Sequence, residues 1–128
     1  MKLFSNDWAT TLKTKINRNQ EYKNSSENLE MRLAFNISTE NRAIILELKD
    51  SECKKVHCTE EKNFVEVDFI IDADAETWQK ILTKNLPPMQ ALLMKKLIIT
   101  KGEMSDLLPY VNALKEILNS ATEVETDY

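Results

Sequence analysis

The pattern of apolar positions changes its period once in the first half of the chain. Trp8, Leu12 and Ile16 recur every four residues and predict a helix over 6–17, capped by Ser5 or Asn6. A second short helix is expected near 17–22. From Met31 onward apolar and polar residues alternate, which predicts strands. These strands are expected at 31–37, 44–48, 53–58 and 64–71.

The connections between these four strands are short, which favours an antiparallel meander. Each strand carries one apolar and one polar face, so one face of the sheet must be covered by other apolar elements. The second half of the chain supplies them. Residues 75–84 place four apolar side chains on one face of a helix, with Asp72 or Asp74 as its cap.

Pro87 and Pro88 predict the start of another helix, because a missing N–H costs nothing in the first turn. Residues 89–94 are apolar nearly all round, so this helix is expected to be buried. A fifth strand is predicted at 96–100, followed by a turn at Gly102. The three-and-four spacing over 104–118 predicts one last helix.

The order of elements predicts an α+β domain: a five-stranded, mostly antiparallel sheet with helices packed on one face. The length of 128 residues fits one domain. We assign residues 1–118 to this domain. Residues 119–128 are polar and acidic and predict a flexible tail.

Composition narrows the function. The net charge of −4 gives no basic surface for nucleic acid and no overall attraction to anionic membranes. No apolar run approaches the ~20 residues that span a bilayer. Residues 1–7 become polar too early for a signal peptide, so a cytoplasmic protein is expected. Gly102 is the only glycine, which excludes a Gly-rich phosphate loop.

Neither a metal nor a cofactor is expected. Cys53 and Cys58 are separated by an odd number of residues, so a regular strand places them on opposite faces. They then share neither a disulfide nor a metal, and His57 lies too far along the strand from Cys53 to help. The carboxylates of Asp72 and Asp74 are better explained by helix capping than by acid–base catalysis.

Several segments together resemble the sterol carrier protein type-2 domain, in its bacterial and archaeal single-domain form. The resemblance is carried by Asp72–Trp78, Leu82–Met94, Lys96–Thr100 and Gly102–Met104, in that order. Trp8 and residues 17–22 are similar to the opening of the same domain. The sequence departs from the family at Lys95, where glycine is frequent, and at Lys101, which precedes Gly102 as an insertion.

The resemblance implies a hydrophobic tunnel between the sheet and its covering helices, with no catalytic residues. It implies non-catalytic binding, and transfer, of a lipid such as a sterol, fatty acid or acyl-CoA. The alternative is an interaction or scaffold module for a lipid-modifying enzyme. An enzyme ranks last, because the Ser, Cys, His and Asp residues form no catalytic constellation.

Eight residues are the candidates for lining this tunnel: Phe35, Leu82, Met89, Leu93, Met94, Met104, Leu108 and Val111. Met94 and Met104 suit a plastic lipid pocket or ordinary core filling equally well. Lys95, Lys96 and Lys101 suit either a lipid head group or a solvated strand edge. The expected partner is a lipid or acyl-CoA. Transient membrane contact is compatible with this function, and the sequence leaves the oligomeric state open.

Overall fold

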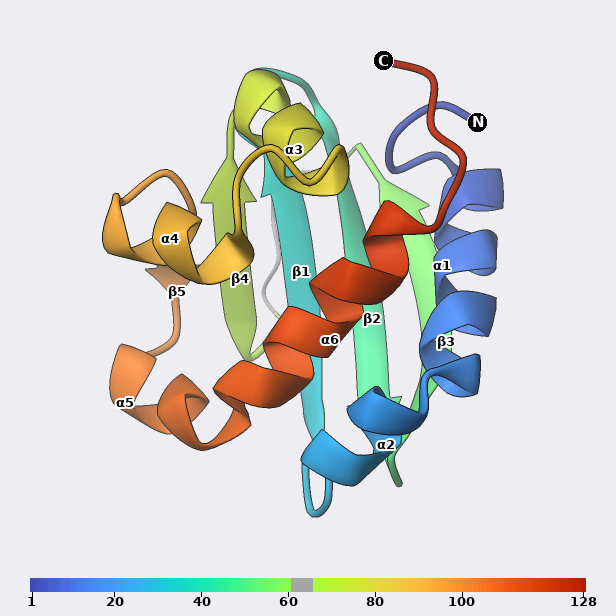
Figure 1. Cartoon of the computed structure of the whole chain (residues 1–128), viewed down its shortest axis with the longest axis vertical. Helices are drawn as coiled ribbons and strands as arrows, with labels where there is room; N and C mark the ends of the chain where they lie inside the picture. Colours follow the sequence, from blue (N-terminus) through green and yellow to red (C-terminus); the bar gives the residue numbers. More distant parts are fainter. Residues whose placement is uncertain (61–65) are drawn as a thin grey trace.

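A five-stranded sheet forms the centre of the computed structural model, which describes residues 1–60 and 66–128 (Figure 1). In the order β3-β2-β1-β4-β5, its strands lie side by side. The strands are β1 (Met31–Ile37), β2 (Arg42–Lys49), β3 (Glu52–Thr59), β4 (Phe69–Ala73) and β5 (Ile98–Lys101). The predicted α+β class and the five strands are therefore confirmed.

The helices lie on one face of this sheet and beside its two edge strands (Figure 1). They are α1 (Asn6–Arg18), α2 (Gln20–Ser25), α3 (Ala75–Leu82), α4 (Pro88–Leu93), α5 (Met104–Leu107) and α6 (Val111–Thr122), with a 3-10 turn η1 (Leu108–Tyr110) before α6. In Figure 1, α6 crosses in front of the central strands, α1 lies beside β3, and α4 and α5 lie beside β5.

The fourth strand departs from the predicted meander. β1, β2 and β3 pair antiparallel as expected, but β4 pairs with β1 in parallel, from Leu33 opposite Phe69 to Ile37 opposite Ala73. β5 then adds antiparallel to β4, which makes the sheet mixed. Alternation identifies a strand and its buried face, but it does not identify the strand's neighbour. Of the predicted 64–71 segment, residues 64 and 65 lie outside the described part of the chain.

Two predicted helix starts are confirmed by their caps. The Ser5 hydroxyl accepts a hydrogen bond from the Trp8 amide at 3.3 Å. The Asp74 carboxylate accepts one from the Thr77 amide at 2.7 Å. Such caps satisfy amides that the first turn leaves unpaired. Hydrogen bonds from Thr77 also hold the pKa of the Asp74 carboxyl below its usual value.

An aromatic cluster joins the N-terminal segment to the sheet and α3. Between ring centroids, Phe4 lies 5.1 Å from Trp8 and 5.3 Å from Trp78, and Phe35 lies 5.3 Å from Trp78. The Trp78 indole N–H donates to the Asn36 carbonyl oxygen at 2.9 Å, so its one polar atom is paired although the ring is buried. Trp78 is therefore a core residue.

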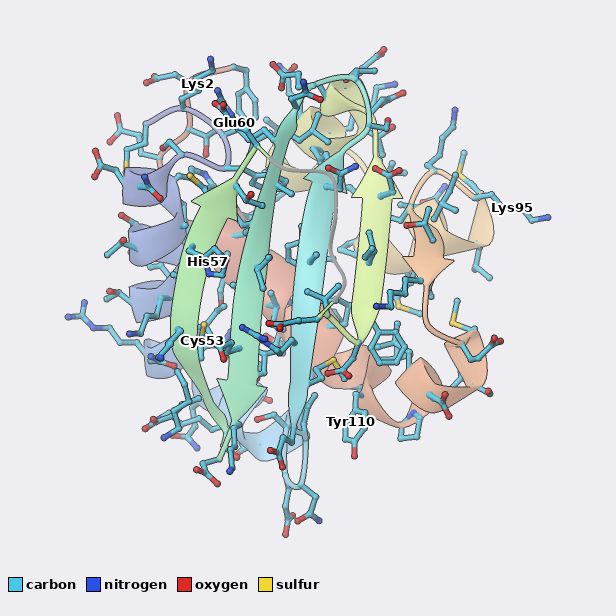
Figure 2. The ribbon with its side chains drawn as sticks, turned by 180° about the vertical axis from the view of Figure 1, so that it is seen from behind. Lys2, Cys53, His57, Glu60, Lys95 and Tyr110 are labelled. Carbon is cyan, nitrogen blue, oxygen red and sulfur yellow. The ribbon has the colours of Figure 1, made fainter. Side chains whose placement is uncertain are left out.

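The opposite-face prediction for the two cysteines is wrong. A β-bulge in the β2–β3 pairing places Leu48 opposite Cys53 and Ile44 opposite Cys58, so both thiols point to the helix-covered face. The extra residue of the bulge reverses the parity that the sequence spacing implied. His57 pairs with Ile45 and lies on the other face, which Figure 2 views directly. Burial raises the pKa of the Cys53 thiol to about 12, as expected of an inert core cysteine.

The turn between β2 and β3 holds two residues in the left-handed conformation, which a substitution can test. Asp50 and Ser51 form a two-residue connection with φ of 55° and 61°, which matches a type I′ turn. Glycine adopts this conformation without a Cβ penalty. Ser51→Gly should therefore raise the free energy of unfolding by about 0.5–1 kcal/mol. Urea denaturation followed by circular dichroism measures this, and a loss of stability would contradict the turn assignment.

The C-terminal part differs from the predicted single helix and tail. The predicted helix is divided into α5, η1 and α6, with Pro109 inside η1. Proline cannot donate the amide hydrogen bond that would continue α5 into α6. Beyond α6, Val124 is buried, and the Trp8 indole N–H donates to the Thr126 hydroxyl at 2.8 Å. The residues predicted as a flexible tail thus pack against the N-terminal segment.

Candidate functional site

α4 is largely exposed, contrary to the prediction that it is buried. Ala91 is its one fully buried residue. Leu93 is 82% exposed, Met94 at the C-cap is 52% exposed and Met89 is 38% exposed. A helix of six residues beside an edge strand presents one side to the core and the rest to solvent. Its all-round apolar composition therefore leaves exposed apolar surface that only a ligand or partner would cover.

The structure separates the eight predicted lining residues into three groups. Phe35 and Leu82 are buried in the core, and Val111 is half-buried at the start of α6. The other five are exposed: Met89, Leu93, Met94, Met104 and Leu108. Phe35 contacts the ring of Trp78 in the core, so the buried and the exposed candidates differ in their surroundings. The tunnel itself stays a prediction.

A groove lies between the α3–α4 connection and α6, with a volume of about 290 Å³. Its walls are mainly apolar. Two lysines, one before α4 and one on α6, and two neutral polar side chains of α6 complete the lining. The lining residues are Ile81, Lys84, Leu86, Pro87, Pro88, Met89, Lys115, Asn119 and Thr122. Met89 is the one predicted residue among them. Apolar walls with a few polar groups are typical of small-molecule sites.

Most of this groove was missed from the sequence. Pro87 and Pro88 were interpreted only as the start of a helix, although they also supply rigid apolar wall. Lys115, Asn119 and Thr122 recur at helical spacing on α6 and form a polar stripe that was a usable signal. Their position opposite α4 depends on the tertiary fold, which no spacing in the sequence reveals.

The end of α4 places Lys95 in a capping position. The Lys95 amide donates to the Leu92 carbonyl at 3.1 Å, and the Lys96 amide donates to the Ala91 carbonyl at 2.8 Å. This is a Schellman C-cap, in which the residue after the cap adopts a left-handed conformation. Lys95 has φ of 57°. Glycine adopts this conformation without a Cβ penalty, so the lysine here accepts some backbone strain and adds a charge.

The carboxylates near α3 have structural roles. Asp74 caps the helix, and Asp72 accepts a hydrogen bond from the Asn36 side chain at 2.9 Å. Glu76 forms an exposed ion pair with Lys80 at 3.3 Å. Within residues 1–60 and 66–128, no three His, Cys, Asp or Glu side chains converge on a metal site. In the same ranges, no helix has the length and apolar character needed to cross a bilayer.

A family model described as the SCP-2 sterol transfer family matches residues 10–115 of the sequence. The chain belongs to this family. A crystal structure of sterol carrier protein 2 superposes with a TM-score of 0.90 at 30% identity, covering 97% of this chain and 100% of that one. Among curated proteins, none matches the chain.

Two further structures extend the comparison. A solution structure from Thermus thermophilus, described as a conserved hypothetical protein and possibly a sterol carrier protein, gives a TM-score of 0.86 at 30% identity. It covers 99% of this chain and 92% of that one. The apo form of sterol carrier protein 2 from Yarrowia lipolytica shares the fold, with a TM-score of 0.58 at 15% identity and coverage of 89% and 88%. The family supports lipid binding as the general function.

Proposed function

We propose that the protein binds a long-chain anionic lipid, such as a fatty acid or acyl-CoA, reversibly and without catalysis. The observation that carries this proposal is the groove between the α3–α4 connection and α6. Its apolar walls suit an acyl chain, and Lys84 and Lys115 suit a carboxylate or phosphate head group. The lysines favour an anionic amphiphile over a neutral sterol.

The volume and the packing of α4 support this site. About 290 Å³ is near the lower end of the 300–1,000 Å³ typical of ligand pockets. α4 is anchored mainly by Ala91, so a small outward movement of this helix would enlarge the groove at little cost in buried surface. An acyl chain would then cover apolar side chains that now face solvent. The predicted tunnel would form in this way.

An interaction or scaffold module is the second candidate. Leu93, Met94 and Ile98 are exposed outside the groove, and such residues also suit a protein partner. The two functions differ in what covers the apolar surface. A lipid carrier gains stability from free lipid, whereas a scaffold module gains it only from its partner.

Long-chain lipid should stabilise the delipidated protein. At one hundred times its dissociation constant, a ligand that binds only the folded state adds about 2.7 kcal/mol. For a domain of this size, the melting temperature should rise by roughly 10 °C. We expect this with palmitate and palmitoyl-CoA and little change with octanoate, because the short chain buries less apolar surface. Differential scanning calorimetry measures the shift.

Two matched variants on α4 locate the binding site. Met89→Glu places a carboxylate among the apolar walls and should abolish the palmitate shift. Gln90→Glu makes a similar charge change on the exposed neighbouring residue and should keep it. Lys84→Gln with Lys115→Gln should weaken palmitate more than hexadecanol. Equal shifts in wild type and Met89→Glu, or no shift with any long-chain lipid, would refute the proposal.

A further inference from the structure

The edge of the molecule formed by the end of α4 and by β5 exposes apolar side chains beside lysines. Leu93, Met94 and Ile98 are all at least half exposed. Lys95 and Lys96 lie between them in the sequence and are exposed as well. Figure 2 shows Lys95 extending outward from this side of the sheet. We name these five residues the basic apolar edge.

The charge of this region is opposite to that of the rest of the chain. Residues 77–102 contain five lysines and no Asp or Glu, whereas the whole chain has a net charge of −4, so the remainder carries −9. Lys80 is paired with Glu76, outside this segment. Lys95 and Lys96 form no ion pair with any residue that the structure describes. The cationic groups at this edge are therefore available to an external anion.

Charge limits what the edge suits. A second copy of the chain would bring Lys95 and Lys96 against their own counterparts, and like charges in contact oppose association. An anionic lipid bilayer complements the edge in both respects. It offers an apolar layer that Leu93 and Met94 can enter and a negative surface that attracts the lysines. The neighbouring α5 carries Asp106, and Glu103 is its N-cap, which confines the attraction to α4 and β5.

The basic helix α1 lacks this combination. α1 carries Lys13, Lys15 and Arg18, but its large apolar residues, among them Leu12, are buried against the core. A cationic helix without exposed apolar side chains has nothing to insert into a membrane interface. The basic apolar edge supplies both contributions on one surface.

We propose that the basic apolar edge docks the protein on the surface of anionic lipid bilayers. This surface is distinct from the groove proposed for lipid binding: none of its five residues lines that groove. Docking would hold the α4 end of the groove close to the membrane, where lipid is exchanged. Because the basic region is local, docking occurs although the protein as a whole is acidic.

Vesicle co-sedimentation of the full chain tests this proposal. The wild type should partition onto phosphatidylcholine vesicles that contain about 30% phosphatidylglycerol and not onto pure phosphatidylcholine, because the anionic surface attracts the lysines. Lys95→Gln with Lys96→Gln should lower the partition coefficient about thirtyfold, at about 1 kcal/mol per lysine. Leu93→Ser with Met94→Ser should lower it about tenfold or more, through loss of apolar burial.

The control removes the same charge at the opposite edge of the sheet. Arg18 on α1 and Lys55 on β3 are away from β5, since β3 is the far edge strand of the sheet. Arg18→Gln with Lys55→Gln should change the partition coefficient less than about threefold, because these residues lie away from the docking surface. Circular dichroism verifies that each variant is folded.

Three results would overturn the proposal. They are an absence of wild-type binding to anionic vesicles, an equal loss in the control variant, and a wild-type dimer in sedimentation equilibrium that Leu93→Ser with Met94→Ser dissociates. The dimer would assign the edge to a second copy of the chain. Vesicle docking without a palmitate shift would refute the proposed lipid binding and leave docking intact, so the two failures are distinguishable.

Discussion

Trp78→Ala should lower the free energy of unfolding by about 3–5 kcal/mol, the range for removing a large aromatic side chain from a core. Trp78 is buried, contacts the rings of Phe4 and Phe35, and donates to the Asn36 carbonyl. The substitution leaves a cavity at the meeting point of three segments and removes the donor from that carbonyl. Urea denaturation followed by circular dichroism measures the loss.

Leu93→Ala is the control for this prediction. A leucine in a buried helix would lose about 2–5 kcal/mol on truncation. Leu93 is mostly exposed, so the ligand-free protein should lose less than about 0.5 kcal/mol. A large loss at Leu93 would show that α4 is packed as the sequence predicts, and would remove the basis for the groove and for the docking edge.

Gly102→Ala should lower the free energy of unfolding by about 3 kcal/mol, from backbone strain and overpacking together. Gly102 has φ of 93°. A Cβ there would collide with the Phe69 ring, lying 2.7 Å from its Cε1, and would lie 2.9 Å from the Asp68 carbonyl oxygen. The ring is held in the core and the carbonyl belongs to the backbone, so neither yields easily. Thermal denaturation should show a fall of roughly 10 °C in melting temperature.

Thr100→Ala, in the strand β5 that ends just before Gly102, provides the control. Thr100 is exposed on β5, so its truncation should change stability by less than about 0.5 kcal/mol. If Gly102→Ala were as mild as Thr100→Ala, the chain could not pass as close to Phe69 as the structure has it. The local packing would then not require glycine, the only one in the sequence, at position 102.

The sequence pattern correctly predicted the features that are determined within a single helix or strand. The four-residue spacing of Trp8, Leu12 and Ile16 predicted α1, and all three side chains are buried. The alternation over 31–37 predicted β1, and the Asp74 cap predicted the start of α3. In each case the signal and the structure it predicts lie within one element.

The predictions that failed concern how helices and strands pair and pack with one another. Alternation indicated the buried face of β4 but not its parallel pairing with β1. The bulge opposite Glu47 and Leu48 reversed the faces of the cysteines, because a single extra residue in β3 has no compositional signal. The apolar composition of α4 was correctly recognised, but burial depends on whether neighbouring elements surround a helix, and at the β5 edge they do not.

The pairing of β4 with β1 has a consequence for synthesis on the ribosome. The chain emerges from its N-terminus, so β1, β2 and β3 can pair before residues 69–73 appear. Until then β1, which ends in the centre of the sheet, presents an open edge with free amides and carbonyls. The nascent protein therefore passes through a stage in which the strand that will lie at the centre of the sheet is an unpaired edge open to aggregation, and the arrival of β4 closes it.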